Sequence, residues 1–131
     1  MEKHYWTAHV EFKMKYYGLS KQKVLGVMRR PERTEKGIAG NSTIAVMQPV
    51  SPKEIENKKV WKQEIWVMYQ IKKQRKRKHQ THHREVSLEK MQTLLSGSTQ
   101  LTIISAWRYP GVSPKNNPIP SDILREIMEY V

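Results

Sequence analysis

Two stretches of the chain decide its fold: residues 60–71, VWKQEIWVMYQI, and residues 101–107, LTIISAW. At its start Val60, Lys62 and Glu64 would lie on one face of a strand and Trp61 and Ile65 on the other, and the stretch is continuously apolar over residues 65–69. Alternation is typical of a strand with one buried face, and an unbroken apolar run is typical of a strand buried on both faces. Together the two stretches predict a β-sheet, with residues 101–107 near its centre.

Helix signals lie before and after these strands. Thr7 and Ser20 are suitable N-caps for two short helices, which Gly18 and Pro31 would end. Residues 42–48 are rich in apolar and β-branched side chains and predict a further strand. After a proline-rich connector, Ser121 is a suitable cap for a helix at about residues 121–131.

The length of 131 residues fits one domain with a single core. We therefore expect a domain of the α+β class that spans residues 1–131. It should consist of two N-terminal helices packed on a three- to four-stranded antiparallel sheet, plus a C-terminal helix, with the helices on one face of the sheet.

The charge balance points to a polyanionic partner. The chain has 24 Lys and Arg against 12 Asp and Glu, for a formal net charge of +12. Such an excess attracts phosphate backbones. Cysteine is absent, which excludes disulfides, thiolate catalysis and cysteine-ligated zinc or iron–sulfur sites. No apolar run is long enough to span a bilayer and no secretory signal is visible, so we expect a cytoplasmic protein that does not bind membranes.

The positive charge is unevenly distributed. Residues 72–84, KKQRKRKHQTHHR, contain no acidic residue and nothing apolar to bury, which predicts an exposed, mobile insertion at about residues 72–100. The candidate nucleic-acid-binding residues are Lys72, Lys73, Arg75, Lys76, Arg77, Lys78 and Arg84 in this run, Arg29, Arg30 and Arg33 near the second helix, and Tyr109, the aromatic residue we expect to be exposed. The three histidines of the run lack a second set of ligands, so no metal is expected, and no cofactor motif is present.

Several short segments resemble a known group of proteins. The matching residues are His9, Lys13, Met14, Gly18 and Leu19, then Val24, Leu25 and Pro31, and then the strands IWVMY at 65–69 and IISAWR at 103–108. In order and spacing they resemble small bacterial domains of unknown function that start with a His-Ala-x-x-Arg-Met-x-x-Arg-Gly-Ile pattern. Those domains are similar to BrnT, a ribonuclease toxin of a toxin–antitoxin pair with a RelE-like fold.

The resemblance implies a toxin-like domain that binds RNA in preference to DNA and cleaves it without a metal. Such cleavage needs an acid or base and cations that stabilise the phosphate charge. His9 would be the acid or base, and Lys13 and Arg108 the cations. The sequence departs from the family at Tyr17, where an arginine is usual, and at Val10, where an alanine is usual. The insertion at 72–100 is a further departure.

Two other functions remain open. The domain can bind nucleic acid without cleaving it, or it can bind an acidic protein such as an antitoxin through its basic surface. Convergence of His9, Lys13 and Arg108 on one concave face would favour the enzyme, and their separation would favour a binding function.

Overall fold

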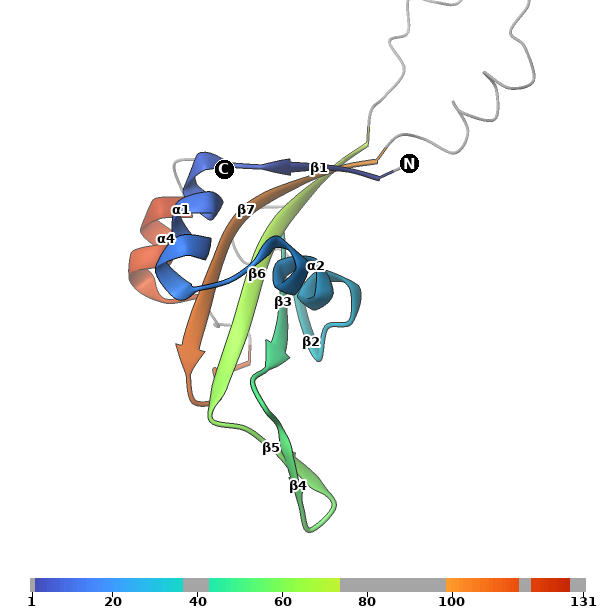
Figure 1. Ribbon diagram of the computed structural model, residues 1–131, viewed down its shortest axis with the longest axis vertical. Helices are drawn as coiled ribbons and strands as arrows, with labels where there is room; N and C mark the ends of the chain where they lie inside the picture. Colours follow the sequence, from blue (N-terminus) through green and yellow to red (C-terminus); the bar gives the residue numbers. More distant parts are fainter. Residues whose placement is uncertain (1, 37–42, 74–98, 116–118, 128–131) are drawn as a thin grey trace, which may run out of the picture.

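The computed structural model describes residues 2–36, 43–73, 99–115 and 119–127. Within these ranges the chain forms a five-stranded sheet, a separate two-stranded hairpin and three helices (Figure 1). The α+β class predicted from the sequence is confirmed.

The five-stranded sheet is mixed and has the order β1-β7-β6-β3-β2. Its strands are β1 (Glu2–Trp6), β2 (Arg33–Lys36), β3 (Thr43–Pro49), β6 (Gln63–Lys73) and β7 (Thr99–Pro110). β1 runs parallel to β7, and the other neighbouring pairs are antiparallel. The predicted three- to four-stranded antiparallel sheet is therefore wrong in strand number and in the direction of β1. The pattern missed β1 because its five residues carry no apolar run and its partner lies in the last third of the sequence.

Two helices follow β1, namely α1 (Ala8–Tyr17) and α2 (Lys21–Arg29). The hydroxyls of Thr7 and Ser20 accept hydrogen bonds from backbone N–H groups in the first turns, each over 3.1 Å. These bonds satisfy amides that the helix itself leaves unpaired. Gly18 ends α1 with φ of 66°, a left-handed conformation that glycine adopts without strain. The Thr7 hydroxyl also lies 3.1 Å from the carbonyls of Ile103 and Ile104, which ties the start of α1 to β7.

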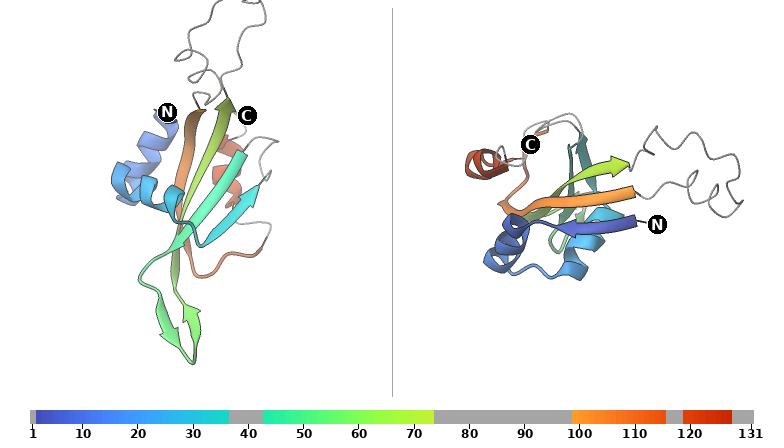
Figure 2. Two further views of the ribbon diagram at one scale, coloured as in Figure 1. Left: turned by 90° about the vertical axis from the view of Figure 1, so that its right-hand side faces the viewer. Right: turned by 90° about the horizontal axis from the view of Figure 1, so that it is seen from above.

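Helices cover both faces of the sheet. Alternate residues of β6 point to opposite sides and are apolar on both, so the strand contributes to a core on each face. On one face, α1 and α2 contribute to a core of Val10, Met14, Leu19, Val24, Val27, Val46, Ile65, Val67, Ile103 and Ala106. On the other, α4 (Ser121–Ile127) and the residues before it cover a core of Ala45, Met47, Trp66, Met68, Ile104, Trp107, Ile119 and Ile123. Figure 2 shows α4 on the opposite side of the sheet from α1 and α2. The expectation that the helices lie on one face is wrong.

Two strand predictions need smaller corrections. Residues 60–71 belong to two strands, because the extended pairing is interrupted at Trp61 and Lys62, between β5 (Lys58–Val60) and β6. β5 pairs with β4 (Lys53–Ile55) in a hairpin. Residues 101–107 lie within β7, an inner strand beside the middle strand β6.

Most of the predicted insertion at 72–100 lies outside the described residues. Its two ends are described as the end of β6 and the start of β7. The C-terminal helix predicted at 121–131 is present as α4, and residues 128–131 lie outside the described ranges.

Candidate nucleic-acid interface

His9 and Lys13 meet at one carboxylate. The Nε2 atom of His9 lies 3.4 Å from Oε2 of Glu126 on α4, and the Nζ atom of Lys13 lies 3.0 Å from the same oxygen. His9 Nε2 also hydrogen-bonds with the hydroxyl of Ser105 on β7 over 3.2 Å. The side chains of His9 and Lys13 are only 11% and 9% exposed. The pair therefore joins α1 to α4 and to β7.

Arg108 contacts the opposite end of α1. Its Nε atom donates to the carbonyl of Tyr17 over 2.8 Å, and its Nη1 atom donates to Oε1 of Gln63 over 3.4 Å. A cation is favourable there, because the carbonyls at the end of a helix carry partial negative charge. Eight residues separate His9 from Tyr17, which is about 12 Å of helix. The structure thus brings His9 and Lys13 together, and Arg108 binds elsewhere.

Burial raises the pKa of the Tyr17 hydroxyl above its ordinary value near 10, and the positive charge of Lys13 opposes this rise. Tyr17 packs against both core clusters from the end of α1. It is the residue that stands where the resembled family has an arginine. The structure uses it as a packing residue at the edge of both cores.

Of the three arginines near α2, Arg33 is held inside the fold. Its guanidinium donates to Oε1 of Glu35 over 3.0 Å and to the carbonyl and hydroxyl of Ser113 over 2.9 and 2.8 Å. It also lies 5.1 Å from the centre of the Trp66 ring. Arg29 and Arg30 are exposed at the end of α2. These two, and not Arg33, present guanidinium groups to solvent.

The carboxylate of Glu64 is the centre of a buried polar network that the sequence analysis did not single out. Glu64 is fully buried. Its carboxylate accepts hydrogen bonds from the indole N–H groups of Trp61 and Trp66, with nitrogen–oxygen distances of 2.8 Å. It also accepts from the amide and the hydroxyl of Ser113, at distances of 3.2 and 2.6 Å. The sequence signal for this network is an acidic residue between two tryptophans, directly before the apolar run at residues 65–69.

Tyr109 is half-buried and packs against the core on the α4 side, so the prediction that it is exposed is wrong. Its position before Pro110 and Gly111 suggested a turn, but β7 continues to Pro110. The aromatic side chains with the largest exposed fractions among the described residues are Tyr5, Phe12 and Tyr16.

A hollow of about 240 Å³ opens on the face that α1 and α2 cover. The strands β1, β6 and β7 and the helix α2 line it with His4, Leu25, Met28, Arg29, Tyr69, Ile71, Thr99 and Leu101. Three of these side chains suit nucleic acid: an exposed guanidinium, an imidazole and a phenol ring. His4 and Tyr69 were not predicted as site residues, because the topology alone brings them together.

The hollow lies at the end of the sheet from which the basic run departs. Lys72 and Lys73 end β6, opposite Gln100 and Thr99 at the start of β7 (Figure 1). The side chains of Arg75, Lys76, Arg77, Lys78 and Arg84 lie outside the described residues. Their predicted contacts with phosphate stay predictions.

Within the described ranges, no group of three His, Asp or Glu side chains is arranged to hold a metal ion, and no helix is long and apolar enough to cross a membrane. The comparisons add no relative: no family model, curated protein or solved structure matches this chain.

Proposed function

We propose that the protein binds nucleic acid, RNA in preference to DNA, at the hollow between β1, α2, β6 and β7. One observation carries the proposal: Arg29, His4 and Tyr69 line a concave surface at the end of the sheet where β6 leads into the basic run, residues 72–84, which contains seven Lys and Arg. The run supplies sequence-independent attraction to phosphate, and the hollow supplies the surface on which a strand would rest.

The chemistry of the hollow favours an unpaired strand over a duplex. Its volume of about 240 Å³ suits one base at a time. Tyr69 offers a ring for stacking, Arg29 a charge for phosphate, and Leu25 and Met28 an apolar wall. A toxin-like, RelE- or BrnT-like fold stays part of the proposal and rests on the sequence resemblance.

The test is a titration of a fluorescein-labelled oligouridine of about 12 nucleotides, followed by anisotropy. Affinity should fall steeply between about 50 and 200 mM salt, because each phosphate contact releases counterions. Arg29→Glu should weaken binding by about tenfold or more. Arg125→Glu is the matched control: the same charge change on an exposed residue of α4, on the other face of the sheet.

Equal losses for Arg29→Glu and Arg125→Glu would mean that the hollow is not the binding site. An oligouridine that does not bind the wild-type chain at about 50 mM salt would overturn the proposed function itself.

Metal-independent RNA cleavage is a second proposal, and the cluster of His9, Lys13 and Glu126 favours it. An imidazole, an ammonium and a carboxylate meet there within 3.4 Å, at an oxygen of Glu126 that is buried. Acid–base chemistry of this kind contributes about 100-fold or more to a rate. Wild-type protein should therefore cleave RNA in a chelator, and His9→Gln should lower the rate by about 100-fold while circular dichroism stays unchanged. RNA that remains intact with the wild-type protein would remove the proposal.

A further inference from the structure

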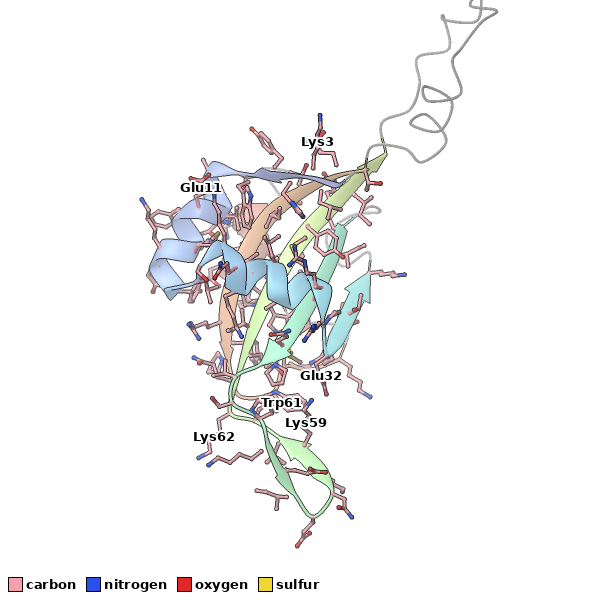
Figure 3. The ribbon with its side chains drawn as sticks, turned by 45° about the vertical axis from the view of Figure 1, so that its right-hand side comes forward. Lys3, Glu11, Glu32, Lys59, Trp61 and Lys62 are labelled. Carbon is pink, nitrogen blue, oxygen red and sulfur yellow. The ribbon has the colours of Figure 1, made fainter. Side chains whose placement is uncertain are left out.

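The hairpin of β4 and β5 projects from the end of the sheet opposite the basic run (Figures 1 and 3). Its turn residues Glu56 and Asn57 have φ of 52° and 64°, as a tight two-residue hairpin turn requires. β4 and β5 are each hydrogen-bonded to only one strand, the other, among those described. A two-stranded ribbon is marginally stable alone and leaves backbone groups along both edges open to a further strand.

A pocket of about 520 Å³ lies at the base of this hairpin. It is lined by Val50, Ser51, Lys53, Ile55, Val60, Trp61, Lys62 and Gln63. Ile55 and Val60 are 55% and 40% exposed, so the hairpin leaves aliphatic surface open to solvent. The free energy falls when an apolar side chain covers such aliphatic surface and removes it from water.

One wall of the pocket is held in place by the buried network. The Trp61 indole donates to Oε2 of Glu64 over 2.8 Å, which fixes the orientation of the ring. Figure 3 shows Trp61 where the hairpin joins the sheet, with Lys59 and Lys62 near it. A wall fixed in advance lowers the entropy that a ligand must lose on binding.

The charges around the pocket select an anionic ligand. Lys53 and Lys62 line it, and both are exposed. The nearby Lys59 is already paired, since its Nζ atom lies 3.2 Å from Oε2 of Glu32. Lys58 is exposed on the same hairpin but does not line the pocket. Two lysines that flank an apolar pocket are complementary to an apolar side chain with acidic neighbours.

We propose that the hairpin is the docking site for an acidic segment of a partner protein. The segment would lie extended along a free edge of the hairpin, with one apolar side chain in the pocket and carboxylates toward Lys53 and Lys62. A protein segment fits better than a nucleobase because three of the lining residues, Val50, Ile55 and Val60, are aliphatic. A second copy of the chain is disfavoured by its net charge of +12.

The experiment is a display selection, in which random peptides of about seven residues are selected for binding to the full chain. The double variant Lys53→Glu, Lys62→Glu serves for counter-selection. Enriched peptides should combine Asp or Glu with an aliphatic or aromatic residue, and should bind the double variant about tenfold more weakly or worse. They should bind the Lys58→Glu variant within about threefold of wild type. In ¹H–¹⁵N spectra they should shift the Trp61 indole resonance, assigned with Trp61→Phe.

Several results would overturn the proposal. The selection could enrich no peptide that prefers wild type to the double variant, or it could enrich basic peptides. In the spectra, oligouridine could shift the Trp61 indole resonance while the peptides do not. A concentration-dependent dimer that Ile55→Ser abolishes would assign the surface to a second copy instead. Because neither Lys53 nor Lys62 lines the hollow, the double variant should still bind oligouridine there. The two proposals can therefore fail separately.

Discussion

Replacement of Glu64 should destabilise the fold far more than replacement of any exposed carboxylate. Glu64 is fully buried and accepts four hydrogen bonds, two from indoles and two from Ser113. Two effects oppose each other. Burial of a carboxylate costs desolvation free energy, which an apolar substitute would recover. Loss of the acceptor leaves buried donors unpaired, at about 1–3 kcal/mol for each donor.

The geometry decides which effect is larger. Leucine at position 64 would leave the Trp66 indole and both the amide and the hydroxyl of Ser113 without an acceptor, since both residues are buried, while the half-buried Trp61 can turn toward water. Three orphaned donors cost about 6 kcal/mol, and Arg33 also loses a nearby carboxylate. Glutamine keeps one oxygen and turns an amide toward an indole N–H, so Glu64→Gln should cost about 3 kcal/mol.

Urea unfolding followed by circular dichroism and tryptophan fluorescence measures both costs. For a chain of this length, about 3 kcal/mol lowers the melting temperature by about 10 °C. Glu54→Gln is the control, because Glu54 is exposed on the hairpin and its loss should stay within about 0.5 kcal/mol. A Glu64→Leu variant as stable as wild type would show that desolvation of the carboxylate outweighs its hydrogen bonds, and would refute this reasoning.

Three further outcomes concern α1 and α2. The raised pKa of Tyr17 means that its contribution to stability is complete below about pH 10 and is lost as pH rises through the folded value. Tyr17→Phe should therefore flatten the alkaline fall in stability. Gly18→Ala should lower the free energy of unfolding by about 1 kcal/mol through its positive φ alone, since an added Cβ meets no atom within 4 Å. Gly26→Ala inside α2 has equal space and should raise the free energy of unfolding by about 0.5–1 kcal/mol, both measured by urea unfolding. Arg108→Ala should cost about 1.5–3 kcal/mol in the same assay, because the Tyr17 carbonyl loses a charged donor; an unchanged midpoint would contradict the capping role.

Local chemistry made part of the fold predictable. Thr7, Ser20 and Gly18 cap helices through hydrogen bonds and backbone angles within a few residues, so these capping roles follow from sequence neighbours alone. β1 is different, because its only described neighbour is β7. No local pattern encodes a pairing with a strand so distant in the chain.

The candidate site was predictable only where charge alone decides. Arg29 and Arg33 look equivalent in the sequence, but β2 points Arg33 toward Ser113 and Trp66. Arg108 was expected to face phosphate, and the topology places it at the end of α1 instead. In each case the role depends on a partner from another element, which a spacing pattern does not contain.

The bond between Thr7 and Ile103 has a consequence for the order in which the protein is made and folds. The two residues are 96 positions apart, and β1 and the start of α1 both depend on β7. At about 5–20 residues per second, a ribosome needs roughly 5–20 s to synthesise the intervening chain. During that interval β1 has no strand to pair with, and α1 lacks its tether. We therefore expect the N-terminal edge of the sheet to form late, after β7 has left the ribosome, and that edge is the part of the nascent chain most in need of protection.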